Sequence, residues 1–256
     1  HEIDVKNYDS FTETLKELEN GELDLLAMPA EILHGKQLEM YNANCEVLGA
    51  RAPRTPNMIL VSENKIKYQP KSAIILSDSK LIRRQLRRAR KGLRVLSTKA
   101  FIEIENIKAN FNDELEKYSW WEELRLNENI DGYVIPRAIY SEVNINGRRH
   151  SLLPDPHNLG DSHYLPQPYS DLVVIIGREN FPKSIAQLFT EVEGDTIWKM
   201  QDYFLGGMDE KQLESIGILV RHRKLSTLMI QAEKHKKLVL RVLKKEKQPQ
   251  SLSLMN

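Results

Sequence analysis

Apolar positions along the chain change spacing from one segment to the next. Residues 11–20 carry them at helical spacing, Ser10 and Glu13 form an S-x-x-E capping box ahead of them, and Asn20-Gly21 supplies a stop. A nearly continuous apolar run follows, ELDLLAM (22–28), which is typical of a strand covered on both faces. A helix leading into a buried strand indicates an α/β protein.

The same alternation returns further along. AIIL (73–76) leads into a helix to about Lys91, Gly92 closes it, and LRVLS (93–97) returns as a strand. IDGYVI (130–135) and DLVVIIG (171–177) predict two more strands. Up to about residue 180 the pattern therefore predicts alternating strands and helices.

Beyond that point the pattern changes. Two helices are expected at about 183–192 and 195–205, before three β-rich runs at 215–223, 226–233 and 237–244. These runs predict a small antiparallel sheet with helices on one face. The last residues, 245–256, are polar and broken by a proline, so a flexible tail is expected.

Composition narrows the function classes. Lys and Arg (37) nearly cancel Asp and Glu (36), so no overall charge favours nucleic acid or membrane. The single cysteine, Cys45, excludes an internal disulfide and suits the cytoplasm or another reducing compartment. No apolar run is long enough to cross a bilayer and the first residues are unlike a signal peptide. We expect a soluble protein without membrane contact, and the start on His1 suggests a trimmed N-terminus.

One local signal is the basic segment ILSDSKLIRRQLRRARKGLR (75–94). Ser77, Asp78 and Ser79 lie where a strand turns into a helix, and such a helix start favours an anion. Arginines in the first turns would add forked donors for carboxylate or phosphate groups. Two other interpretations stay open: a solvated helix face, or a helix at 80–94 that contacts RNA or a protein partner.

A second local signal is the irregular segment 144–168, which contains His150, His157 and His163 with Asp155 and Asp161. These residue types can coordinate zinc, but their spacing matches no ligand pattern. We therefore predict no metal site.

The order of segments resembles hydroxymethylbilane synthase, also called porphobilinogen deaminase. Six segments carry the resemblance: FTETLKELENGELDLL (11–26), APRTPNMILV (52–61), ILSDSKLIRRQLRRARKGLRVL (75–96), IDGYVIPRAIY (130–140), YLPQPYSDLVVIIGR (164–178) and FLGGM (204–208). They span roughly residues 10–243 and rest on order and spacing more than on identity.

The resemblance implies an α/β fold of two doubly wound, periplasmic-binding-protein-like domains joined by crossing strands, with a small C-terminal α+β domain. On this chain it places domain 1 at 1–64 and 167–181, with its N-terminal part missing or reduced. Domain 2 falls at 65–166, domain 3 at 182–244 and the tail at 245–256.

The family's site residues are mostly replaced. Its cysteine anchor for a dipyrromethane cofactor falls on Met208, whose alkylated sulfur forms no thioether, so no cofactor is expected. Its catalytic carboxylate falls near Ile32, leaving Glu31 as a candidate acid or base if the chain is active. The expected anion-binding residues are Ser77, Ser79, Arg83, Arg84 and Lys99.

These losses favour a non-catalytic relative of an enzyme that makes hydroxymethylbilane from porphobilinogen in tetrapyrrole (haem) biosynthesis. Such a protein would bind a tetrapyrrole or another anionic small molecule in the interdomain cleft, or a protein or RNA partner on the basic helix 80–94. The alternatives are an active but divergent hydroxymethylbilane synthase and a structural subunit of a larger assembly.

Overall fold

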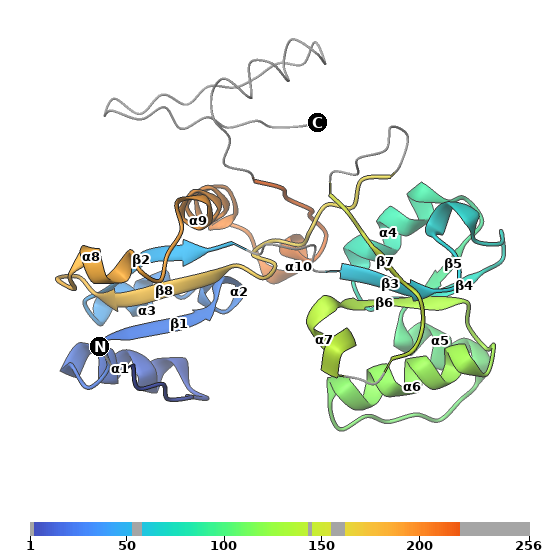
Figure 1. Cartoon of the computed structure of the whole chain (residues 1–256), viewed down its shortest axis with the longest axis horizontal. Helices are drawn as coiled ribbons and strands as arrows, with labels where there is room; N and C mark the ends of the chain where they lie inside the picture. The colour runs from blue at the N-terminus through green and yellow to red at the C-terminus, as the bar shows by residue number, and fades with distance from the viewer. Residues whose placement is uncertain (1–2, 53–57, 143–144, 155–161, 221–256) are drawn as a thin grey trace, which may run out of the picture. The chain divides into compact units, whose positions relative to one another are not determined.

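The computed structural model describes residues 3–52, 58–142, 145–154 and 162–220. The chain divides into two compact units: unit 1 comprises residues 1–53, 169–208 and 220–256, and unit 2 comprises 54–168 and 209–219. Each unit has its own sheet with helices packed against it (Figure 1). The predicted α/β class is therefore confirmed.

Unit 2 is built on a five-stranded mixed sheet in the order β5-β4-β6-β3-β7. Its strands are β3 (Met58–Ser62), β4 (Ile74–Leu76), β5 (Arg94–Leu96), β6 (Gly132–Pro136) and β7 (Arg149–Ser151). β4 runs parallel to β5 and β6, whereas β3 is antiparallel to β6 and to β7. Its helices are η1 (Ile66–Tyr68), α4 (Lys80–Ala89), α5 (Thr98–Glu105), α6 (Glu114–Leu126), α7 (Arg137–Glu142) and α10 (Glu210–Leu213).

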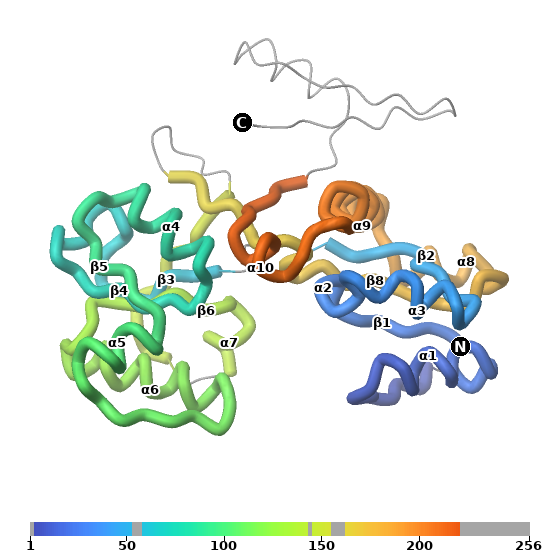
Figure 2. Tube along the Cα trace, turned by 180° about the vertical axis from the view of Figure 1, so that it is seen from behind, coloured from blue at the N-terminus to red at the C-terminus, as the bar shows by residue number. Residues whose placement is uncertain are grey.

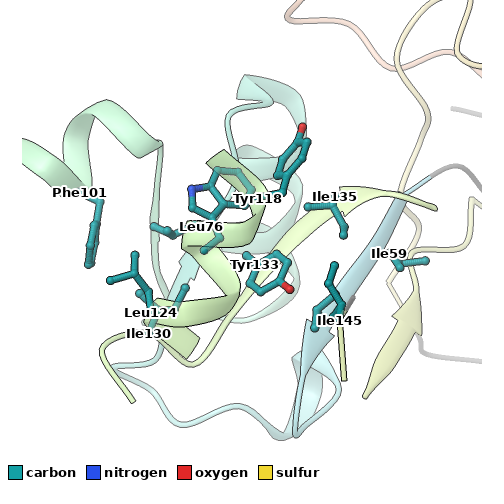
Figure 3. Close-up of a cluster of buried hydrophobic side chains, with 11 residues drawn as sticks. Ile59, Leu76, Phe101, Tyr118, Leu124, Ile130, Tyr133, Ile135 and Ile145 are labelled. Atoms are coloured by element: carbon teal, nitrogen blue, oxygen red, sulfur yellow. The ribbon is translucent and has the colours of Figure 1, made fainter. Parts of the chain in front are cut away.

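Helices cover both faces of this sheet, as Figure 1 shows for α4 on one side and α5 and α6 on the other. One face packs Phe101, Tyr118 and Leu124 against the strand residues Leu76 and Tyr133 (Figure 3). The neighbouring strand residues point to the opposite face, because successive side chains of a strand alternate. There Ile75 and Val134 pack with Ile82 and Leu86 of α4. Two buried faces explain why these strands are apolar without interruption.

Unit 1 has a three-stranded sheet in the order β1-β8-β2, formed by β1 (Leu25–Pro29), β2 (Cys45–Arg51) and β8 (Val173–Arg178). Its helices are α1 (Phe11–Asn20), α2 (Ala30–Leu33), α3 (Gln37–Asn42), α8 (Lys183–Ala186) and α9 (Val192–Leu205). β8 runs antiparallel to both neighbours. The expected doubly wound arrangement is therefore not seen here, because a strand from late in the chain lies between the two early ones and runs in the opposite direction.

Helices α1 and α9 lie on opposite sides of the unit 1 sheet (Figures 1 and 2). The boundaries of α1 confirm the sequence prediction: the side chain of Ser10 caps its start, and Gly21 ends it at a φ of 79°. α9 approaches β2 closely at Gly194, where a β-carbon would lie 2.3 Å from the carbonyl oxygen of Ala50. α9 begins at Val192 and α8 ends at Ala186, so the first expected helix is shorter and the second longer than predicted.

The C-terminal sheet expected from the sequence falls almost wholly outside the described residues, as does the tail 245–256. Of its first run, residues 216–220 are described and form no regular element. Strand β3, which the sequence analysis placed in domain 1, pairs within unit 2. The division into three domains stays a prediction.

Candidate functional site

The topology of unit 2 singles out one edge of its sheet. β4 connects through α4 to β5 on one side, and the chain later returns as β6 on the other side of β4. Adjacent parallel strands whose connections leave in opposite directions create a topological switch point, and open α/β sheets bind ligands outside the carboxyl ends of such strands. The segments that follow β4 and β6 therefore form the candidate site.

The segment after β4 is the loop Ser77–Asp78–Ser79. The side chain of Ser79 caps α4, because its Oγ accepts a hydrogen bond of 3.3 Å from the backbone N–H of Ile82. The preceding two backbone N–H groups of α4, on Lys80 and Leu81, have no acceptor among the described residues. Free N–H groups at a helix start carry partial positive charge and suit an anion.

Ser77 is the buried member of this loop, with 1% of its surface exposed. Its backbone N–H donates to the carbonyl of Leu96 at 2.9 Å, but its hydroxyl has no hydrogen-bond partner in the described part of the chain. A buried polar group without a partner costs about 1–3 kcal/mol. Orphaned groups of this kind are rare, and binding is one reason to keep them.

Arg83 folds back over the same loop from the second turn of α4. Its Nη1 donates to the carbonyl oxygens of Ser77 and Asp78, each at 2.7 Å. Its Nε and Nη2 groups meet no acceptor within the described ranges. Burial and the nearby charge of Arg87 lower the pKa of the Arg83 guanidinium, which still stays cationic at neutral pH.

Arg137 supplies a second guanidinium at this edge. It begins α7 immediately after β6, is half-buried, and forms no hydrogen bond or ion pair in the described part of the protein. The sequence analysis missed it. Its position directly after the apolar run that forms β6 was the available signal, because residues following a buried parallel strand lie at the carboxyl edge of the sheet.

The neighbouring helix start, on α5, is already filled by a side chain. The carboxylate of Asp78 accepts from the backbone N–H of Thr98 at 2.9 Å and from its hydroxyl at 2.9 Å. Lys117 of α6 completes the group at 3.1 Å. Burial raises the pKa of Asp78, but the hydrogen bonds from Thr98 and Lys117 outweigh burial, so its pKa lies below the ordinary value. The carboxylate stays ionised.

The predicted anion-binding residues thus fall into two sets. Ser77, Ser79 and Arg83 come together in the β4–α4 loop. Arg84 is exposed and directs its Nη1 to the carbonyl of Ser215 at 3.4 Å. Lys99 is exposed on the first turn of α5, next to the helix start that Asp78 fills. The structure therefore does not bring Arg84 and Lys99 into the loop.

Glu31 and Met208 lie in unit 1. Glu31 is exposed in the short helix α2, and after burial it is the second cause that raises the pKa of Asp171. The backbone carbonyl of Met208 accepts a hydrogen bond of 2.8 Å from Nε2 of His34, whose other ring nitrogen lies 3.3 Å from the hydroxyl of Tyr169. The residue expected at a cofactor position therefore contributes its backbone to packing.

The histidines with described surroundings bond to backbone oxygens. His150 uses Nε2 to donate to Ser62 at 3.0 Å, and His163 uses Nδ1 to donate to Pro154 at 2.9 Å. His157, Asp155 and Asp161 lie outside the described residues. Elsewhere in the described ranges no three His, Cys, Asp or Glu side chains gather as metal ligands. No described helix is both long and apolar enough to cross a membrane.

Comparisons with known proteins give weak similarities. No family model and no curated protein matches the chain. A periplasmic substrate-binding protein of an ABC transporter from Coxiella burnetii is 13% identical over 80% of this chain and 84% of its own, with a TM-score of 0.33. The aliphatic sulphonate binding protein SsuA from Escherichia coli is 13% identical over 77% of this chain, with a TM-score of 0.34, and the match spans only 57% of SsuA. A protein from Bacillus subtilis described as a methionine-binding lipoprotein is 12% identical over 79% of this chain and 81% of its own, with a TM-score of 0.32.

These findings correct the resemblance drawn from the sequence. The solved structures found are binding proteins and not hydroxymethylbilane synthases, so the predicted membership of that family is wrong, together with its place in tetrapyrrole (haem) biosynthesis. The predicted cytoplasmic or otherwise reducing compartment is contradicted as well, because these proteins are described as periplasmic or as a lipoprotein. The resemblance failed because it rested on segment order, which many α/β chains share. The expectation that no cofactor is bound stays a prediction.

Proposed function

We propose that this chain is a ligand-binding protein that holds a small anionic molecule at the carboxyl edge of the unit 2 sheet, between β4 and β6. The observation that carries the proposal is Arg137: a half-buried guanidinium after a core strand, without a partner among the described residues. A guanidinium that is partly removed from water gains most when a planar or tetrahedral oxyanion takes the place of that water.

The β4–α4 loop adds donors of a different kind. The backbone N–H groups of Lys80 and Leu81 lack acceptors in the described chain, and a ligand oxygen would give the orphaned hydroxyl of Ser77 the partner it lacks. Nε and Nη2 of Arg83 remain for a further bond. Together these groups favour a carboxylate, sulfonate or phosphate, and they provide donors without an acidic group in the loop that is free to take a proton.

Asp78 supports this assignment because it is the one acidic residue of the loop and its charge is already balanced. Its carboxylate is committed to Thr98 and to the ammonium of Lys117. An anion at the start of α4 therefore meets a site whose nearest negative charge is compensated. Without Lys117, repulsion by Asp78 would oppose binding.

Isothermal titration calorimetry with three probes tests the proposal: an aliphatic sulfonate, an amino acid and inorganic phosphate, one for each oxyanion class. We expect at least one probe to bind the full chain saturably. Arg137→Met should weaken that binding roughly 10-fold to 100-fold, because a hydrogen bond to a charged group contributes about 1.5–3 kcal/mol.

The matched control is Arg88→Met, which removes the same charge from an exposed position of α4. It should leave the affinity unchanged. If no probe binds the wild-type chain, or if both variants weaken binding equally, the proposed site is wrong.

A further inference from the structure

The basic charge of the chain is concentrated in one continuous stretch of unit 2. Residues 65–99 hold twelve of the 37 Lys and Arg residues but only one of the 36 Asp and Glu residues, Asp78. The remainder of the chain is therefore acidic. A protein that is almost neutral overall has one strongly positive region.

The structure displays much of this charge on one face of α4. The exposed residues Lys80, Arg84, Arg87, Arg88 and Lys91 repeat at intervals of three and four, so they form one stripe, named here the basic stripe. The opposite face of the helix, with Ile82 and Leu86, is 2% and 0% exposed in the core. The stripe is about 16 Å long at a rise of about 1.5 Å per residue.

The ends of two further segments lie beside the C-terminal end of the stripe. Arg90 donates from Nε and Nη2 to the carbonyl of Gln69, at 3.0 and 2.8 Å. Gly92, at a φ of 92°, packs so closely on Lys71 that a β-carbon would lie 2.9 Å from its carbonyl oxygen. These contacts bring Lys71 and the exposed Arg94 next to the stripe and enlarge the positive surface.

The stripe is not neutralised within the described part of the chain. Arg84 and Arg87 donate to the backbone carbonyls of Ser215 and Val95, and no carboxylate pairs with any of the five residues. Backbone carbonyls hold the guanidinium groups in place without cancelling their charge.

The stripe is also unfavourable for the helix that carries it. Like charges at spacing i,i+4, such as Lys80 with Arg84 and Arg84 with Arg88, each cost about 0.2–0.5 kcal/mol. Lys80 in the first turn meets the positive end of the helix dipole, and only the arginines of the last turn are placed where the dipole favours them. Folding therefore does not account for the stripe, and a polyanionic partner does.

The surface chemistry distinguishes among polyanions. Protein interfaces have an apolar or aromatic centre, yet Tyr68 is the one large exposed hydrophobic residue in the described segment 65–99. A helix that lies on a membrane inserts an apolar face into the lipid, and the apolar face of α4 is buried in the core. Purely electrostatic contact through forked guanidinium groups is the way proteins hold nucleic-acid phosphates.

We infer that the basic stripe of α4 binds the phosphate backbone of a nucleic-acid duplex without reading its sequence. Over about 16 Å a duplex presents about nine phosphate charges, since it carries one per about 1.7 Å of axis. The stripe thus meets a denser array of negative charge than any single acidic side chain offers. This inference is independent of the small-anion site at the other edge of the loop.

Fluorescence anisotropy of the full chain with a labelled DNA duplex of arbitrary sequence tests the inference. Binding should be saturable at about 50 mM salt and should weaken steeply by about 200 mM, with a slope of log K against log salt near −0.9 for each phosphate contacted. The variant Lys80→Gln/Arg84→Gln/Arg88→Gln/Lys91→Gln should bind roughly ten-fold or more weakly and should reduce the magnitude of that slope by about three.

The matched control, Lys16→Gln/Lys108→Gln/Lys183→Gln/Lys199→Gln, removes the same net charge from exposed positions elsewhere. It should keep most of the affinity. Urea unfolding of both variants shows that each is folded. Absence of duplex binding at low salt, or an equal loss in both variants, overturns the inference. Tighter binding to polyglutamate or to phosphatidylglycerol vesicles than to the duplex overturns it too, and would assign the stripe to an acidic protein or to a membrane.

Discussion

Two helix starts in unit 2 follow adjacent parallel strands and meet different partners. At α5 the carboxylate of Asp78 bonds to Thr98 and is held by Lys117, while the cap residue Ser97 accepts from the N–H of Ala100 at 3.3 Å. At α4 the cap Ser79 makes the same 3.3 Å bond, but no carboxylate of the described chain reaches the free N–H groups beyond it. The local caps are alike, and the difference lies in the charge that fills the helix start.

That difference shows how the same local chemistry can serve structure at one helix and binding at the next. An anion at a helix start contributes about 0.3–1 kcal/mol or more, and α5 obtains this stabilisation from its own chain. α4 does not, and basic side chains surround its start instead. We interpret the first as a structural ion site and the second as an open one.

The largest effect on this comparison should come from Asp78→Ala. Removing the carboxylate leaves the start of α5 unfilled and Lys117, at 16% side-chain exposure, without its buried partner. The side chain of Asp78 is itself 40% exposed, so solvent reduces the loss, which we expect to be about 2 kcal/mol in urea unfolding. Sulfate should restore part of this stability by taking the vacated place.

The control is Asp9→Ala, since Asp9 is exposed and without a partner among the described residues. It should change the stability little and respond little to sulfate. If Asp78→Ala is as stable as Asp9→Ala, the α5 start is not the structural ion site described here.

The pH dependence of stability should sharpen the same contrast. The pKa of Asp78 in the folded chain lies below its ordinary value of 3.8, so its contribution is present above that value and is lost as the pH falls through the lower folded pKa. The wild-type chain should therefore lose more stability than Asp78→Ala between about pH 5 and pH 2. Parallel curves of unfolding free energy in this range would show that the carboxylate gains nothing from Thr98 and Lys117.

The smallest expected effect compares the two caps directly. Ser79→Ala and Ser97→Ala should each cost about 1 kcal/mol of stability, because both hydroxyls cap with bonds of equal length. Only Ser79→Ala should also weaken binding of the anionic probe, by roughly 3-fold to 10-fold for one lost neutral hydrogen bond. Equal affinity in both variants would mean that the α4 cap does not contact the ligand.

Local signals made much of the fold predictable. Ser10 and Gly21 fixed both ends of α1, and the apolar runs located β4, β5, β6 and β8, because such patterns depend only on neighbours in the chain. The placement of β8 between β1 and β2 was not predictable in this way. It depends on pairing between residues about 130 positions apart, such as Val47 with Ile176, for which a single sequence carries no local pattern.

The candidate site divides along the same line. Ser77, Ser79 and Arg83 were found because they are close in sequence at a strand–helix turn. Arg137 was missed, since only the sheet order brings the end of β6 beside β4. The role of Asp78 was missed for the same reason: its partner Lys117 lies in α6, and the sequence offered no reason to pair them.

The account stands or falls on which helix start meets the anion. Backbone amide chemical shifts of the isotopically labelled full chain, followed during titration with the tightest-binding probe, measure this residue by residue. We predict saturable shifts for the amides of Lys80 and Leu81 and little change for those of Thr98 and Lys99. Saturation at Thr98 and Lys99 with no response at Lys80 and Leu81 would contradict the account.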